Sequence, residues 1–254
     1  MEIILDQKRA AARLRAYRLD NRHPISRRLF RTRSLPSHTR MLRSHLPWLE
    51  EVEQTDPLVY PPWQAEKPNT IPNICPRRDV ASAAFQKWAD TRPPLSMFLF
   101  TDGSRLINTD TAGAGWYGYW GAGKQEFTHG HVCLPKHEVF DAEATAALEG
   151  LKAAFNSIQA NFTQNLYILL DNQEVAQQLQ GHPRGSSQHT ILAFQETANT
   201  WPTRSPQCQA IPSGRVHVHW IPGHAGIAGN ELADEQAVTA QRQTNSANIS
   251  NYAI

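Results

Sequence analysis

The sequence is poor in cysteine and contains no long apolar run. Its cysteines, Cys75, Cys133 and Cys208, are widely separated and form no CxxC pair, which excludes a disulfide framework and a zinc–thiolate cluster. We therefore expect reduced, intracellular thiols. No apolar run reaches the roughly 18 residues of a membrane span, and the opening "MEIILDQKRAAARLR" becomes charged too early for a secretory signal. The sequence predicts a protein of the cytoplasm or nucleus, not secreted and without a membrane partner.

Charge of either sign is scarce overall but unevenly distributed. The formal net charge is +2, whereas residues 1–45 contain 12 Lys and Arg against 3 acidic residues, a net of +9. The remainder has 13 basic and 20 acidic residues, a net of −7. A basic head suggests a polyanionic partner, and an acidic body suggests clustered carboxylates that need cations.

The composition changes along the chain and predicts three regions. Residues 1–94 combine a basic helix at 5–19 with a Pro-rich connector from His23 onward, where regular elements must be short. The basic helix is either a nucleic-acid contact or a solvated face. Residues 95–242 have the pattern of one α/β domain, and residues 243–254 form a polar tail.

Within the predicted domain, strands come first and then alternate with helices. The pattern predicts a three-stranded meander followed by crossovers of the parallel kind, with no internal repeat and no glycine-rich phosphate loop. Ser186 or Ser187 is the expected cap of the third helix. The predicted strands are 96–101, 112–120, 124–134, 165–170 and 215–222, and the predicted helices are 138–158, 173–180, 186–201 and 229–241.

Four acidic residues occupy positions suited to a shared site. Asp102 and Asp171 each follow a predicted strand, so parallel pairing of those strands would bring both carboxylates to one sheet edge. Glu143 and Asp234 lie early in alanine-lined helices that can pack close to the sheet. Each has a simpler explanation: a turn at Asp102, a helix cap at Asp171, the helix dipole for Glu143 and a solvated helix face for Asp234. The combination favours a site.

Clustered carboxylates without cysteine or histidine nearby favour Mg²⁺, or Mn²⁺, over Zn²⁺. Such a cluster can hold two ions about 4 Å apart for an in-line phosphoryl displacement, which suggests phosphodiester hydrolysis. His224 lies between Gly223 and Gly226 in a predicted loop, ten residues before Asp234. A histidine on such a loop can carry a proton near neutral pH, although a plain surface histidine has the same signature.

The segments "FTDGS", "AEATAAL", "LLDNQ" and "WIPGHAGIAGNELADEQA" occur in this order and resemble one family. They are similar to ribonuclease H type 1, specifically the domain of non-LTR (LINE-type) retrotransposon reverse transcriptase polyproteins, over about residues 95–241. The resemblance implies a five-stranded mixed sheet in the order 3-2-1-4-5 with flanking helices. It also implies endonucleolytic cleavage of the RNA strand of RNA:DNA hybrids, leaving 5′-phosphate and 3′-hydroxyl ends.

The resemblance also implies roles for individual residues. Asp102, Glu143, Asp171 and Asp234 would bind two metal ions, and His224 would be a mobile proton carrier. The positions along the hybrid would be Gly103, Ser104, Gln173 and Asn230, and contacts to 2′-hydroxyls across the minor groove can distinguish RNA from DNA.

The sequence departs from some relatives in one respect that affects binding. The segment "GHPRGSSQH" is short where those relatives have a basic helical protrusion, and this should weaken phosphate contacts. The basic head, or a reverse transcriptase domain absent from this chain, could replace them. The head itself resembles the segment that joins polymerase to ribonuclease H in these polyproteins, so the chain could be a fragment of one.

Three functions remain open from the sequence. The leading one is an active metal-dependent ribonuclease H. The second is a catalytically silent retroelement-derived remnant that binds nucleic acid. A DNA nuclease or transposase of the same superfamily ranks well below both, because it would lack the "GHAGIAGNELAD" loop and helix.

Overall fold

The computed structural model of the protein describes residues 74–75, 77–106, 110–183, 185–205 and 207–249. All of them belong to the second of two units into which the chain divides, residues 67–254. The basic helix predicted at 5–19, most of the Pro-rich connector and residues 250–254 of the tail lie outside the described residues. Within the described ranges, no helix is both long and apolar enough to cross a membrane.

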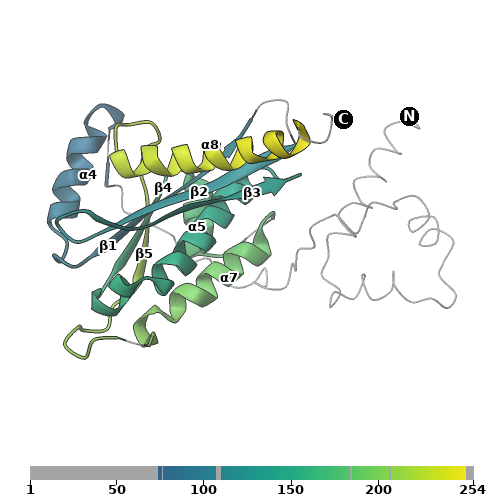
Figure 1. Cartoon of the computed structure of the whole chain (residues 1–254). Helices are drawn as coiled ribbons and strands as arrows, with labels where there is room; N and C mark the ends of the chain where they lie inside the picture. The colour runs from purple at the N-terminus through teal and green to yellow at the C-terminus, as the bar shows by residue number, and fades with distance from the viewer. Residues whose placement is uncertain (1–73, 76, 107–109, 184, 206, 250–254) are drawn as a thin grey trace, which may run out of the picture. The chain divides into compact units, whose positions relative to one another are not determined.

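Five strands form one mixed sheet in the order β3-β2-β1-β4-β5 (Figure 1). The first three pair antiparallel, while β4 runs parallel to both β1 and β5. This confirms the fold and the strand order that the resemblance implied. The strands are β1 (Met97–Arg105), β2 (Thr111–Trp120), β3 (Gln125–Pro135), β4 (Leu166–Leu170) and β5 (Val216–Trp220).

Helices cover both faces of the sheet (Figure 1). One face carries α5 (Val139–Asn156), α6 (Gln173–Gln180) and α7 (Gln188–Asn199), and the other carries α4 (Ala81–Asp90) and α8 (Ala228–Ile249). Short 3-10 segments lie at η2 (Arg78–Val80), η3 (Ile158–Phe162) and η4 (Trp201–Thr203). The fold is therefore a three-layer arrangement with an apolar core on each side of the sheet.

β1 contributes to both cores because its side chains alternate between the two faces. Leu99 packs in the core under α5, α6 and α7, whereas Phe100 packs in the core under α4 and α8. The same alternation places Asp102 on the α8 side and Gly103 on the α5 side of the sheet. β1 thus presents successive residues to the helices of both layers.

The prediction that the first strand ends at Thr101 is wrong. β1 continues to Arg105, and Asp102, Gly103 and Ser104 pair with β2 instead of turning the chain. Aspartate and glycine favour turns locally, but the antiparallel ladder with β2 supplies tertiary hydrogen bonds that override this preference.

Two helices differ from the sequence-based expectation. α4 lies within the residues predicted as connector, and its Ala81 and Phe85 are buried against the sheet. α8 does not end near Gln241 but continues to Ile249. The described part of the domain therefore includes a helix before β1, and this helix packs on the α8 side of the sheet.

Close contact between α8 and the sheet depends on glycine in β2. A Cβ atom on Gly115 would lie 2.2 Å from the backbone nitrogen of Ala237 and 2.4 Å from the carbonyl oxygen of Ala233. A Cβ atom on Gly113 would lie 2.1 Å from the Ala237 carbonyl oxygen. These glycines and the alanines of α8 let helix and sheet meet backbone to backbone.

Candidate active site

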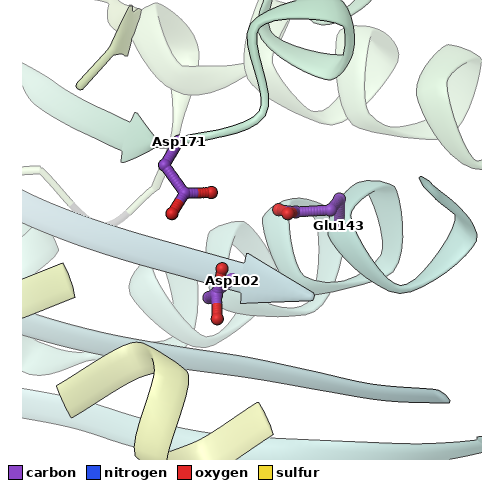
Figure 2. Close-up of side chains that lie close together, drawn as sticks. All are labelled: Asp102, Glu143 and Asp171. Atoms are coloured by element: carbon purple, nitrogen blue, oxygen red, sulfur yellow. The ribbon is translucent and has the colours of Figure 1, made fainter. Parts of the chain in front are cut away.

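Three carboxylates from three different elements meet at one edge of the sheet. Asp102, Glu143 and Asp171 each offer an oxygen atom, and these atoms all lie within 4.8 Å of one another. Figure 2 shows the three side chains converging from the end region of β1, from α5 and from the end of β4. Asp102 and Glu143 are buried, with 7% and 3% of their surface exposed, and Asp171 is half-buried.

The pairing of β1 with β4 places the two aspartates. Their parallel register runs from Met97 opposite Leu166 to Thr101 opposite Leu170, and Asp102 and Asp171 are the next residues on each strand. The prediction that parallel pairing brings these carboxylates to the same edge is confirmed. Asn172 accepts a hydrogen bond from the Val175 N–H at 3.1 Å and caps α6, so Asp171 does not serve as that cap.

Glu143 reaches the cluster because α5 lies almost against β1. A Cβ atom on Gly103 would lie 2.5 Å from the Glu143 backbone nitrogen and 2.7 Å from its Cγ atom, so no larger residue fits there without displacement. The start of α5 is also tied to the end of β1, since Arg105 donates to the Glu138 carboxylate. Glu143 is therefore fixed by both packing and a charged contact one turn away.

Asp234 lies at the margin of the three-carboxylate cluster. It is half-buried on α8, its side chain lies close enough to accept a hydrogen bond from protonated Asp102, and its charge acts on both Asp102 and Asp171. Its oxygens are not among those within 4.8 Å of one another. The structure thus brings the fourth predicted carboxylate beside the site, nearest to Asp102.

Asp171 is surrounded by the loop and helix that follow β5. The Asn230 side-chain amide donates to Asp171 Oδ2 at 3.3 Å, and a Cβ atom on Gly223 would lie 2.3 Å from that same oxygen. His224 is exposed, has a left-handed backbone with φ 48°, and its charge lowers the pKa of Asp171. The predicted proton carrier is therefore beside the carboxylates, on the solvent side.

The predicted substrate-contact residues fall into two groups. Ser104 is half-buried in β1 and Gln173 is exposed at the start of α6, so both have surface near the site. Gly103 and Asn230 support the carboxylates, through close packing with Glu143 and the hydrogen bond to Asp171, and their contact with the hybrid stays a prediction. Asn230 is only 2% exposed. The supporting role of Gly223 was not predicted, although a glycine before a loop histidine is a signal for close approach.

The surroundings of the cluster disfavour ionisation of its carboxylates. Burial, together with the charges of Asp171 and Asp234, raises the pKa of Asp102 to about 8. Burial and the charges of Asp102 and Asp171 also raise the pKa of Glu143 well above its usual range. Burial raises the pKa of Asp171 too, against the hydrogen bond from Asn230. Among the described residues, the buried Oε2 atom of Glu143 has no hydrogen-bond partner.

We expect the stability of the metal-free protein to fall as pH rises from about 4 to about 8. In that window the folded Asp102, with its pKa of about 8, holds a proton that the unfolded chain has released, so deprotonation favours unfolding. Asp102→Asn removes this charge and should be the more stable protein at pH 8 by about 1 kcal/mol or more, with the difference vanishing toward pH 4. Urea unfolding in EDTA across this pH range measures the free energy of unfolding of both proteins. The same pH dependence of this free energy in wild type and Asp102→Asn would contradict the prediction.

Comparison with known proteins decides the family. The profile of the RNase H family matches residues 94–242, which is more than half of the chain. The chain belongs to the RNase H family. Proteins of this family act on RNA:DNA hybrids and typically use divalent metal ions. A comparison with curated protein sequences finds no match.

Several solved RNase H structures are similar to this RNase H chain. One is RNase H1 from the archaeon Halobacterium salinarum NRC-1, with 21% identity and a TM-score of 0.42, over 58% of this chain and 98% of that one. The N-terminal RNase H domain of Rv2228c from Mycobacterium tuberculosis has 16% identity and a TM-score of 0.43, over 59% and 99%. LC11-RNase H1, isolated from compost by a metagenomic approach, has 17% identity and a TM-score of 0.42, over 57% and 97%.

The carboxylate site of this RNase H chain fits a divalent cation. Its donors are hard carboxylate oxygens, which suit Mg²⁺ or Mn²⁺, and the described groups around them do not supply a balancing positive charge from lysine or arginine. A bound cation would favour the ionised carboxylates and give the Glu143 Oε2 atom a partner. Asp102, Glu143 and Asp171 are the residues placed to hold it, with Asp234 alongside.

Proposed function

We propose that this chain is a metal-dependent endoribonuclease that hydrolyses the RNA strand of RNA:DNA hybrids and leaves 5′-phosphate ends. Membership of the RNase H family supports the reaction class. The observation that carries the proposal for this chain is the buried cluster of Asp102, Glu143 and Asp171, whose ionised forms are destabilised by burial and by mutual repulsion. Such an arrangement is unfavourable for stability alone and suits a site that binds cations.

In the proposed mechanism, Asp102, Glu143, Asp171 and Asp234 would hold two Mg²⁺ ions. When bound, two such ions activate water and stabilise the leaving oxygen of an in-line phosphoryl displacement. The protein's own contribution is to hold the carboxylates rigidly: Gly103 lets Glu143 approach, and Asn230 orients Asp171. His224, which is exposed on its loop, would carry a proton to or from the reacting phosphate.

The substrate and its context are part of the same proposal. The hybrid would lie along the site edge, with Ser104 and Gln173 at the surface that it contacts. Reading of 2′-hydroxyls there would restrict cleavage to the RNA strand. The motifs that resemble non-LTR retrotransposon polyproteins support a reverse transcriptase domain as the natural neighbour, and the basic residues of 1–45 would add phosphate contacts.

Cleavage of an end-labelled RNA:DNA hybrid by the purified full chain tests this function. We expect Mg²⁺-dependent cuts within the RNA strand with 5′-phosphate ends, no cutting of the DNA strand or of double-stranded DNA, and loss of cleavage in EDTA. A well-folded protein that binds the hybrid equally with and without Mg²⁺ but never cuts it would instead support the catalytically silent binding protein.

A further inference from the structure

The segment before β1 packs against the loop that carries His224. Ala81 and Phe85 of α4 are buried in the same apolar core as Ile221 and Ile227, the residues at the two ends of this loop. Figure 1 shows α4 beside the start of α8 and the connection that leads into it. α4 therefore forms part of the support on which the His224 loop rests.

Arg78, just before α4, contacts the loop directly. Its Nε and Nη2 atoms both donate to the Gly223 carbonyl oxygen, at 3.0 and 2.5 Å, across 145 residues of sequence. A guanidinium group presents its donors in a fixed planar fork, so two donors on one carbonyl restrict that carbonyl's orientation. This contact is not required by the apolar core, because Arg78 itself is exposed.

The Gly223 carbonyl belongs to the peptide plane that continues into the backbone nitrogen of His224. Holding this plane restricts the backbone rotation that directs the His224 side chain, which has the unusual φ of 48°. The other side of Gly223 is limited as well, because a Cβ atom there would lie 2.3 Å from Asp171 Oδ2. Gly223 is thus held between a guanidinium group and a carboxylate of the site.

We propose that Arg78 is a positioning residue that fixes the His224 loop for the proton-transfer step. This inference rests on the proposed function of His224 and deepens it, because it places one determinant of activity outside the residues 94–242 that match the family. The residues just before the family match then set how well the histidine is presented, and a change in η2 alters turnover through the loop.

The test compares Arg78→Ala with the neighbouring Arg77→Ala as a matched control. Arg77 is an exposed arginine whose contacts are with Asp79 at 2.6 and 3.1 Å, not with the loop. We expect Arg78→Ala to lower kcat about tenfold with little change in KM, Arg78→Lys to recover part of the loss, and Arg77→Ala to match wild type. The melting temperature of all three should stay within about 2 °C of wild type.

Two further measurements separate positioning from a general structural effect. In a His224→Ala background, Arg78→Ala should cause no additional loss, because the side chain it positions is gone. Hydrogen exchange of residues 223–226 should be faster in Arg78→Ala than in Arg77→Ala. An equal loss of kcat with and without His224, or unchanged exchange of the loop, overturns the proposal. If the wild type cleaves no hybrid, the proposed function fails, and exchange alone decides whether Arg78 holds the loop.

Discussion

Replacement of Asp102 by Asn should reduce hybrid cleavage by about 10³-fold or more while leaving the protein folded. Asp102 interacts with all three of the other carboxylates: its carboxylate interacts with Asp171 and Asp234, and its charge acts on Glu143. Asparagine has nearly the same shape but removes one negative charge and one ligand oxygen. Single-turnover cleavage at saturating enzyme measures the chemical step and separates it from hybrid binding.

A conservative change elsewhere provides the control for this result. Asp90, at the end of α4, is exposed and accepts a hydrogen bond from Gln86 through an oxygen that asparagine retains, so Asp90→Asn should cleave at the wild-type rate. Mg²⁺ should also raise the melting temperature of wild type and Asp90→Asn but not of Asp102→Asn, since a ligand stabilises only the state that binds it. Residual cleavage by Asp102→Asn within tenfold of wild type would exclude the proposed role of this carboxylate.

Gly115→Ala should destabilise the domain by about 3 kcal/mol, the upper range for an added methyl group in a close-packed interior. The new Cβ atom would lie 2.2 and 2.4 Å from backbone atoms of α8, and backbone cannot rotate away as a flexible side chain can. Because α8 also carries Asp234, its displacement should lower cleavage as well. Chemical unfolding at a fixed pH, followed by circular dichroism, gives the change in free energy of unfolding.

Gly123→Ala is the matched control for this substitution. A Cβ atom there meets nothing within 4 Å, so the same chemical change should alter stability by no more than about 0.5 kcal/mol. If Gly115→Ala proved as stable as Gly123→Ala, the backbone-to-backbone contact between α8 and β2 would be wrong.

Much of the carboxylate site could be predicted from the sequence because its logic is local. Asp102 and Asp171 each follow an apolar run, and parallel pairing of such runs leads directly to a shared edge. Glu143 lies among alanines, which indicate a helix face that approaches a sheet. The distances between the carboxylate oxygens could not be predicted from the sequence. They depend on how closely α5 packs against β1 at Gly103, which only the folded structure shows.

Local conformational preference alone gives the wrong end for β1 and does not reveal α4. The tripeptide at Asp102 favours a turn on its own, but β2 pairs with it and extends the strand to Arg105. The helix α4 was missed because prolines flank it, although Ala81, Phe85 and Trp88 have helical spacing. The contact between Arg78 and Gly223 spans 145 residues and has no sequence signature at all.

The helix α8 follows all five strands of the sheet in the sequence, and this order bears on how the domain is completed. Among the described elements, all other strands and helices precede α8 along the chain, yet α8 supplies Asp234, Asn230 and the cover over Gly113 and Gly115. Contacts so distant in sequence form after the local ones, because closing a long loop costs entropy first. A chain that ends before α8 would keep Asp102, Glu143 and Asp171 but would lack Asp234, Asn230 and the cover over the two glycines.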